Sequence, residues 1–372
     1  MNTQETYIGE GSIRVLTELL RKKSPQKILI VRGKKSYSLC GAQKIIKNLI
    51  DNLKLTVSEF SDFTENPKEE DVIKGLQVLY REKPEIIIGI GGGSVIDMSK
   101  LLRFYYYHPN KFKTNSIYKS GFYIPLIAIP TTAGTGSEAT HFAVMYSNKI
   151  KFSIAHPDVL PDVAIVDPVF TYHNPAYLTA CTGFDALAQA IESYWNVAAT
   201  TESQKFALQA IQLIWENLPL AINNENCIEV RQKIAEGAFW AGKAINITKT
   251  TGPHALSYSF TTYYHIPHGH AVAYTFPFFF AKNTYLKAEL DYQERIETLL
   301  KILNVKSTDN RTQFFINYLE KISLSLRLPE EFDFSLILSN INMDRLKNNP
   351  GIKDIIVLKR ELYNYFLWLN NR

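Results

Sequence analysis

EIIIGIGGGSVIDMSK, residues 85–100, is the stretch from which the fold can be derived. A run of isoleucines leads into three consecutive glycines, and residues with helical spacing follow at once. A fully buried strand joined to a helix by so short a turn is typical of a parallel sheet covered by helices. Glycines let the backbone approach a ligand closely, and the helix offers free N–H groups and its positive dipole end to an anion. The turn is therefore either a phosphate-binding site or simply a tight connection.

Within this turn, Ser94 is expected to cap the helix, and Asp97 three residues later to complete a capping box. The turn matches neither the GxGxxG fingerprint nor the Walker GxxxxGK[ST] motif. A dinucleotide bound here would belong to a different lineage of nucleotide-binding sheets.

The segments on either side of the turn alternate in the same way. Short apolar runs predict strands at 27–33, 55–60, 85–94, 123–132 and 163–168, and amphipathic stretches predict helices at 42–51, 69–82 and 95–107. This alternation indicates an α/β fold with a doubly wound parallel sheet. After about residue 170 the period becomes helical throughout, over 175–197, 201–223, 228–248, 280–304 and 310–324. We therefore expect a dinucleotide-binding α/β domain at 1–170, an all-α metal- and substrate-binding domain at 171–372, and a cleft between them.

Composition narrows the class of protein. At 372 residues, with 46% hydrophobic and 21% charged side chains, two domains of an ordinary globular protein are expected. No apolar run is long enough for a membrane span, and the N-terminus lacks the apolar core of a signal peptide. The three cysteines are widely spaced, which favours a reducing, cytoplasmic setting. The net charge of +5 weakly favours anionic small molecules and does not indicate nucleic acid as a partner.

Two further segments carry polar side chains in suggestive positions. PTTAGTGSEAT, residues 130–140, is a loop of hydroxyls and glycines after a buried strand, where open α/β sheets bind ligands. GFDALAQAIESYW, residues 183–195, predicts a buried helix with Asp185 and Gln189 on one face. From these residues alone, the helix is a metal site, the remnant of one, or a helix with two polar side chains.

Four motifs occur in order along the chain: GGGSVID, PTTAGTGSE, GFDALAQAIE, and HALSY followed by IPHGHAVA. Together they resemble the iron-containing (group III) alcohol dehydrogenase family, over roughly residues 5–280. The remaining C-terminal residues provide no motif. The resemblance implies that the glycine turn binds the pyrophosphate of the cofactor and that the hydroxyl loop flanks it. The cofactor-contacting positions that it implies are Asn66, Gly92, Gly93, Ser94, Asp97, Thr131, Thr132, Thr140 and Lys151.

The resemblance also implies a divalent metal, Fe²⁺ or Zn²⁺, held by an Asp and a His four residues apart and by two histidines downstream. The corresponding positions here are Asp185, Gln189, His254 and His268. Glutamine offers only a neutral amide oxygen, which is a weaker ligand than imidazole. The alternatives are a retained metal, with Gln189 in or just outside the ligand set, and a lost metal, with Gln189 bonded only to Asp185.

The implied reaction is hydride transfer between a nicotinamide and a carbonyl carbon that the metal polarises. His268, His254-linked water, the cofactor ribose and Tyr258 are the candidate proton donors; Tyr258 stands where the family often has a second His. A core-packing role for Tyr258 is the alternative. His265 and His270 are expected to be solvated or to support the ligands from outside.

Cations and hydroxyls precede His254 in AGKAINITKTTGPHALSY. Lys243, Thr248 and Lys249 suit a phosphonate or phosphate group, Lys249 being also a catalytic candidate, and His141 is a further polar candidate. The local sequence is similar to the phosphonoacetaldehyde reductase branch, which reduces phosphonoacetaldehyde to 2-hydroxyethylphosphonate. The alternatives are a general short-chain alcohol dehydrogenase or aldehyde reductase, in which these lysines are merely solvated, and a non-catalytic nucleotide-binding relative.

The choice of cofactor depends on the end of the first predicted strand. NAD-preferring relatives often carry an Asp there, whereas this chain has Gly33 flanked by Arg32, Lys34 and Lys35. A missing carboxylate and added cations suit a 2′-phosphate, so NADPH is favoured over NADH. The resemblance also implies a homodimer.

Overall fold

The computed structural model describes residues 4–109, 122–147, 150–223, 227–351 and 354–372. They form two compact units: residues 1–174 with 225–239, and residues 175–224 with 240–372. No helix in these ranges is both long enough and apolar enough to cross a membrane.

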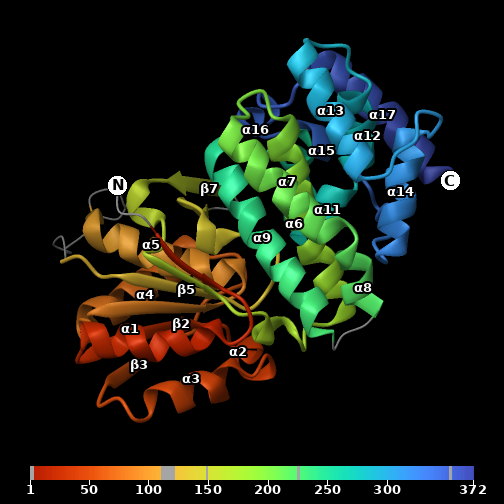
Figure 1. Cartoon of the computed structure of the whole chain (residues 1–372). Coiled ribbons are helices and arrows are strands. Elements are labelled where there is room, and N and C mark those ends of the chain that lie inside the picture. Colours follow the sequence, from red (N-terminus) through yellow and green to blue (C-terminus); the bar gives the residue numbers. More distant parts are fainter. Residues whose placement is uncertain (1–3, 110–121, 148–149, 224–226, 352–353) are drawn as a thin grey trace. The chain divides into compact units, whose positions relative to one another are not determined.

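The first unit is built on a six-stranded parallel sheet (Figure 1). Its strand order is β1-β8-β5-β4-β2-β3, and every described pairing is parallel. The strands are β1 (Glu5–Ile8), β2 (Lys27–Arg32), β3 (Thr56–Phe60), β4 (Ile86–Gly91), β5 (Leu126–Pro130) and β8 (Val163–Val166). The chain runs from β2 outward to β3, then returns to β4 on the other side of β2. The carboxyl ends of β2 and β4 therefore form the switch point at which open sheets bind ligands.

Helices cover both faces of this sheet. Along β4, Ile86 and Ile88 pack in the cluster that contains residues of α1 (Val15–Lys23) and α3 (Ala42–Ile50). Ile87 belongs to the opposite cluster, with residues of α4 (Glu69–Glu82) and α5 (Gly93–Tyr107). Alternate side chains of one strand thus enter two cores, which explains why the strand is apolar without a break. The predicted doubly wound α/β fold is confirmed.

Two features of this unit did not follow from the apolar pattern. The edge strand β1 pairs with β8, although its residues are largely exposed and carry no apolar run. A separate antiparallel hairpin, β6 (Phe142–Ser147) with β7 (Ile150–Ala155), lies in the stretch between β5 and β8.

The second unit is helical, as the period of its sequence predicts. The predicted metal positions lie on α6 (Ala176–Trp195), α10 (Gly252–Tyr264) and α11 (His268–Ala273). Also present are α7 (Thr201–Trp215), α8 (Asn217–Asn223), the end of α9 (Ile228–Thr248), α12 (Phe276–Thr284), α13 (Leu290–Ile302), α14 (Arg311–Lys321), α15 (Phe334–Ser339), α16 (Met343–Leu346) and α17 (Ile355–Asn370).

Two predicted helices are each divided into two, and the prediction of continuous helices was wrong there. The stretch 201–223 breaks after Trp215 because Pro219 has no N–H to donate to the Trp215 carbonyl, which accepts from the Tyr318 hydroxyl instead (3.0 Å). The stretch 280–304 breaks after Thr284, whose carbonyl accepts a hydrogen bond from the Arg311 side chain. In both cases a distant side chain satisfies the exposed helix end.

Candidate active site

The glycine turn lies at the switch point of the first unit. Helix α5 begins at Gly93, its cap residue is Gly92, and no side chain of a described residue caps it. The predicted capping box of Ser94 and Asp97 is therefore wrong. The Asp97 carboxylate instead accepts hydrogen bonds from the Ser137 hydroxyl (2.6 Å) and the Val144 N–H (3.1 Å). Asp97 thus ties α5 to the hydroxyl loop and the hairpin, and leaves the helix start without a competing side chain.

The hydroxyl loop packs directly against this turn. A side chain at Gly93 would lie 2.7 Å from the methyl and hydroxyl of Thr135, so the loop requires glycine there. The backbone of Thr131 donates to the Gly91 carbonyl (3.0 Å), whereas Thr132 is only half-buried. Thr140 is buried, and its hydroxyl accepts from the Lys100 ammonium (3.2 Å). The loop is thus held by the helix that it faces.

A buried acid and base support the same loop. Burial lowers the pKa of Lys100 to about 8. Burial also raises the pKa of Glu138 to about 7. The Lys100 ammonium donates to Ser137, Thr140 and the Phe142 carbonyl, at 2.9, 3.2 and 2.7 Å.

The remaining cofactor candidates have different surroundings. Gly33 follows β2 at the switch point, and Arg32 beside it pairs with Glu59 (2.7 Å). Asn66 is exposed, and the side chain of Lys151 falls outside the described residues. His141 is half-buried, with its ring 4.2 Å from that of Phe142. Of these positions, Gly33 is the one that lies at the carboxyl end of a strand next to β4.

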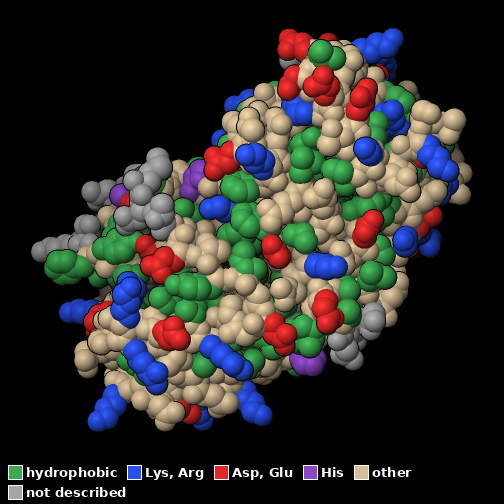
Figure 2. Space-filling model, in the orientation of Figure 1, with side chains coloured by type: hydrophobic (Ala, Val, Ile, Leu, Met, Phe, Trp, Pro, Cys, Tyr) green, Lys and Arg blue, Asp and Glu red, His purple; other side chains and the backbone are tan. Residues whose placement is uncertain are grey.

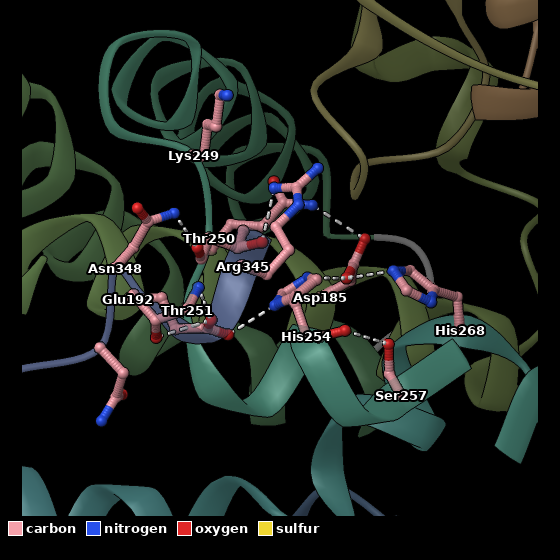
Figure 3. Close-up of polar contacts among 12 residues, drawn as sticks. Asp185, Glu192, Lys249, Thr250, Thr251, His254, Ser257, His268, Arg345 and Asn348 are labelled. Carbon is pink, nitrogen blue, oxygen red and sulfur yellow. Dashed lines mark hydrogen bonds and ion pairs between the residues drawn. The ribbon is translucent and has the colours of Figure 1, made fainter. Parts of the chain in front are cut away.

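In the second unit, three of the four predicted metal positions come together (Figure 3). One donor atom each from Asp185, His254 and His268 lies within 4.8 Å of the other two. The Asp185 Oδ1 atom is 3.2 Å from His254 Nε2 and 3.9 Å from His268 Nε2. A carboxylate and two imidazoles converging in this way are a competent ligand set for Zn²⁺ or Fe²⁺ with a position left for another ligand.

The close approach of α11 to α6 depends on a glycine. A Cβ on Gly269 would collide with the backbone carbonyl of Cys181, and it would also lie 3.1 Å from the Asp185 Cβ. Pro267 precedes the first residue of α11, His268, and fixes the start of that helix. The sequence Pro-His-Gly therefore places His268 over the Asp185 turn of α6.

Gln189 is buried beside the acid. Its Nε2 donates to Asp185 Oδ2 (3.0 Å), while its Oε1 is buried and has no hydrogen-bond partner among the described residues. A buried carbonyl oxygen without a donor is costly unless a cation or donor reaches it. The Oε1 atom of Gln189, without a described donor and next to a carboxylate and two imidazoles, fits a bound divalent ion.

Glu192 is a functional candidate that the sequence reasoning missed. It is fully buried, and its Oε1 lies 2.5 Å from His254 Nδ1. Its Oε2 accepts from the N–H (2.5 Å) and the hydroxyl (2.9 Å) of Thr251, the residue before α10. A proton on Nδ1 shared with Glu192 leaves the lone pair of Nε2 facing Asp185, as in a carboxylate–histidine–metal arrangement. The available signal was its position seven residues after Asp185, on the same helix face.

The carboxylates also set the protonation of His254 in the metal-free protein. Burial by itself would lower the pKa of this imidazole, but the charges and hydrogen bonds of Glu192 and Asp185 outweigh it and raise the pKa to about 9. A metal ion and a proton therefore compete for the imidazole of His254.

The other candidate residues of this unit are placed as follows. The Tyr258 ring is stacked on that of His268, with centroids 6.2 Å apart. His265 ends α10 in an exposed, left-handed conformation. His270 bonds to the Tyr177 hydroxyl (2.8 Å) and the Ser325 carbonyl (2.6 Å), and burial lowers its pKa. These contacts place His265 and His270 outside the ligand cluster.

The cationic stretch before α10 is only partly buried. Thr248 is buried, and its hydroxyl bonds to Ser193 Oγ (2.8 Å). Lys243 is half-buried, and burial lowers its pKa. Lys249 is exposed and points away from the other labelled side chains in Figure 3.

A second group of possible ligands, His108, His156 and Asp158, lies in the first unit. Local hydrogen bonds account for this group without a metal. His156 caps the short helical turn that follows it, because its Nδ1 accepts from the Asp158 N–H (3.2 Å), and Asp158 pairs with His108 (2.8 Å).

Comparison with known proteins agrees with this geometry. Residues 3–168 match the family description "Iron-containing alcohol dehydrogenase", and residues 179–342 match "Fe-containing alcohol dehydrogenase family, C-terminal". The NAD-dependent methanol dehydrogenase of Bacillus methanolicus is 31% identical, over 94% of this chain and 95% of that protein. The NADPH-dependent butanol dehydrogenase of Clostridium saccharobutylicum is 29% identical, over 88% and 84%.

Among solved structures, sulfoacetaldehyde reductase from Bifidobacterium kashiwanohense in complex with NAD⁺ is similar. Its TM-score is 0.84 at 27% identity, with 98% of this chain and 97% of that chain covered. Both halves of the chain and its fold thus agree with the resemblance drawn from the four motifs. The chain belongs to the iron-containing alcohol dehydrogenase family.

Proposed function

We propose that this protein catalyses the metal-dependent, NAD(P)H-linked reduction of a small anionic aldehyde, phosphonoacetaldehyde, to its alcohol, 2-hydroxyethylphosphonate. The observation that carries the proposal is the convergence of Asp185, His254 and His268, with Glu192 behind His254. A bound divalent ion supplies Lewis acidity toward a carbonyl oxygen, and a reduced nicotinamide supplies the hydride. One aldehyde, one hydride and one proton give one alcohol.

Each residue of the cluster has a distinct proposed role. Asp185, His254 and His268 would hold the ion, and Glu192 keeps the proton of His254 on Nδ1. Gln189 donates to one oxygen of Asp185, which orients the other oxygen toward the imidazoles. Tyr258 is the proposed proton donor to the product oxygen, because its ring is stacked on that of His268 beside this cluster. His268 would be occupied as a ligand.

The cofactor is proposed to bind at the switch point of the sheet. The uncapped start of α5, at Gly92, Gly93 and Ser94, suits a pyrophosphate. We propose NADPH as the preferred form, because Gly33 provides no carboxylate for ribose hydroxyls and Lys34 and Lys35 are exposed beside it. Arg32 is paired with Glu59, and the Lys34 ammonium lies 4.0 Å from Asp62.

The anionic substrate is supported by Lys243 and Lys249 in the stretch before α10 and by the similarity to a sulfoacetaldehyde reductase. That relative acts on an aldehyde whose sulfonate resembles a phosphonate in charge and shape. In the second unit, Lys243, Thr248 and Lys249 are the proposed contacts to the anionic group. His141, in the first unit, is kept as a separate polar candidate. A second function, short-chain alcohol dehydrogenation, is favoured by the similarity to methanol and butanol dehydrogenases.

A substrate panel separates these functions. Purified protein is loaded with Fe²⁺ or Zn²⁺, and oxidation of NADPH and of NADH is followed with phosphonoacetaldehyde, sulfoacetaldehyde and propanal. The proposal predicts the highest kcat/KM for phosphonoacetaldehyde with NADPH. A clear preference for propanal would replace it with the second function, and a higher rate with NADH would refute the cofactor choice. Absence of both bound metal and turnover would indicate a non-catalytic relative.

A further inference from the structure

Arg345, in the C-terminal region without a motif, is a half-buried arginine that donates to a hydroxyl. Its side chain is half-buried, and its described side-chain hydrogen bond runs from Nη1 to the Thr250 hydroxyl (2.6 Å). Within the described ranges, no carboxylate lies within ion-pair distance of its guanidinium. Among the described arginines, Arg32, Arg81, Arg103, Arg295 and Arg372 do have such partners, whereas the half-buried Arg311, like Arg345, donates to an uncharged oxygen.

The segment that carries Arg345 is fixed to the start of α10. The Asn342 N–H donates to the Ala255 carbonyl (3.0 Å), and Asn348 Nδ2 donates to the Thr250 carbonyl (3.1 Å). Arg345 lies between these two anchors, on α16. Its guanidinium therefore has a defined position beside Thr250, as Figure 3 shows.

A short chain of contacts connects this position to the metal cluster. Thr250 is followed by Thr251, whose N–H and hydroxyl bond to Glu192, and Glu192 bonds to His254. Thr250 and His254 are four positions apart in the sequence, so their Cα atoms are at most about 14 Å apart even in an extended chain. The guanidinium is thus held, through Thr250, at the start of the chain segment that carries the ligand candidate His254.

Electrostatics favours an anionic ligand beside the guanidinium of Arg345, which has no carboxylate partner among the described residues. Arginine stays charged at any working pH, so partial burial without a counter-charge has a desolvation cost. Its planar array of five N–H donors matches the oxygens of a phosphonate or sulfonate, and Thr250 occupies one nitrogen only. We propose that Arg345 binds the anionic group of the substrate and so determines specificity, an inference that rests on the proposed function.

Lys249 is less well placed for this task. It is exposed, takes a left-handed backbone conformation (φ 65°) at the end of α9, and points away from the cluster in Figure 3. A solvated ammonium contributes little, whereas a half-buried guanidinium contributes more. Arg345 is therefore expected to outweigh Lys249 in recognition of the anion.

The test compares Arg345→Gln and Arg345→Lys with the wild type. Lys347→Ala is the matched control, because Lys347 is an exposed cation two residues away that pairs with Asp344 (2.7 Å). We expect Arg345→Gln to lower kcat/KM for phosphonoacetaldehyde by about 10- to 100-fold while leaving propanal nearly unchanged. Arg345→Lys should retain part of the activity, and Lys347→Ala all of it. Circular dichroism and the Tm verify folding of each variant.

Binding of 2-hydroxyethylphosphonate to the metal-loaded protein with NADP⁺, measured by calorimetry, provides a second readout that needs no turnover. Equal losses for both aldehydes, or no loss for phosphonoacetaldehyde, would overturn the role of Arg345. If the wild type reduces propanal but not phosphonoacetaldehyde, the proposed function fails and the calorimetry decides on Arg345 alone. If the wild type binds 2-hydroxyethylphosphonate and Arg345→Gln binds it more weakly, Arg345 still forms an anion site. If the wild type does not bind it, or if both proteins bind it equally, Arg345 has no such role.

Discussion

Replacement of Glu192 by Gln tests whether a buried carboxylate prepares His254 for a metal. Glu192 accepts three hydrogen bonds, from His254 Nδ1 and from the N–H and hydroxyl of Thr251. Glutamine has one acceptor oxygen and one NH₂ group. If the oxygen faces His254, the NH₂ faces the Thr251 N–H, and in the flipped orientation it faces His254. Each orientation sets a donor against a donor, so one buried group loses its partner.

The magnitude follows from these contacts. Loss of a carboxylate that supports a ligating His typically weakens metal binding by about 10- to 100-fold, or about 1.4 to 2.8 kcal/mol. An unsatisfied buried donor costs about 1 to 3 kcal/mol of stability. We therefore expect Glu192→Gln to weaken Zn²⁺ binding by about 10- to 100-fold and to lower the Tm of the metal-free protein.

The assay is a Zn²⁺ titration of metal-free protein against a chromophoric chelator, with thermal unfolding in parallel. Glu297→Gln is the matched control, since it makes the same chemical change at an exposed position of α13. A folded Glu192→Gln protein whose Zn²⁺ affinity stays within about threefold of the wild type, well short of the 10-fold expected, would refute the reasoning.

Three further predictions concern other parts of the chain. Gln189→His should tighten Zn²⁺ binding by about 10-fold or more, because an imidazole is a better ligand than an amide oxygen; unchanged affinity would mean that position 189 faces away from the ion. Lys249→Ala should raise KM for phosphonoacetaldehyde by about two- to fivefold and leave propanal unchanged, as expected for an exposed charge; equal effects on both would remove Lys249 from recognition. Glu138→Gln should flatten the pH dependence of stability. Burial raises the pKa of Glu138 to about 7 from an ordinary value of 4.5, so between these values the folded protein holds a proton that the unfolded chain has lost. The free energy of unfolding of the wild type therefore falls as pH rises through that window, by at most about 1.4 kcal/mol per pH unit. Urea unfolding at pH 5 and 7 measures this, and an unaltered slope in the variant would contradict it.

The face of the molecule in Figure 2 shows no broad patch of one charge sign. On the face shown in Figure 2, Lys and Arg side chains are interspersed with Asp and Glu. The proposal about anion recognition therefore depends on the half-buried Arg345 and not on a charged surface patch.

Local pattern was sufficient for the main features of the fold. Strands and helices of the first unit repeat over a few residues, so the isoleucine run of β4 and the amphipathic α4 could be predicted with nearly correct bounds. Pro219 was a local signal for the break after Trp215. The break after Thr284 could not be predicted, because the distant Arg311 side chain satisfies that helix end. The exposed strand β1 depends likewise on pairing with β8, more than 150 residues away.

The same division applies to the site. Asp185, His254 and His268 were identifiable because they lie within motifs, and Glu192 could have been identified from its place on the Asp185 face of one helix. Whether the ligands converge depends on α11 approaching α6 at Gly269, which is a matter of backbone packing. Arg345 lies 95 residues from Thr250 in sequence. Such a contact leaves no periodic trace along the chain, because it is created only when non-local segments pack together.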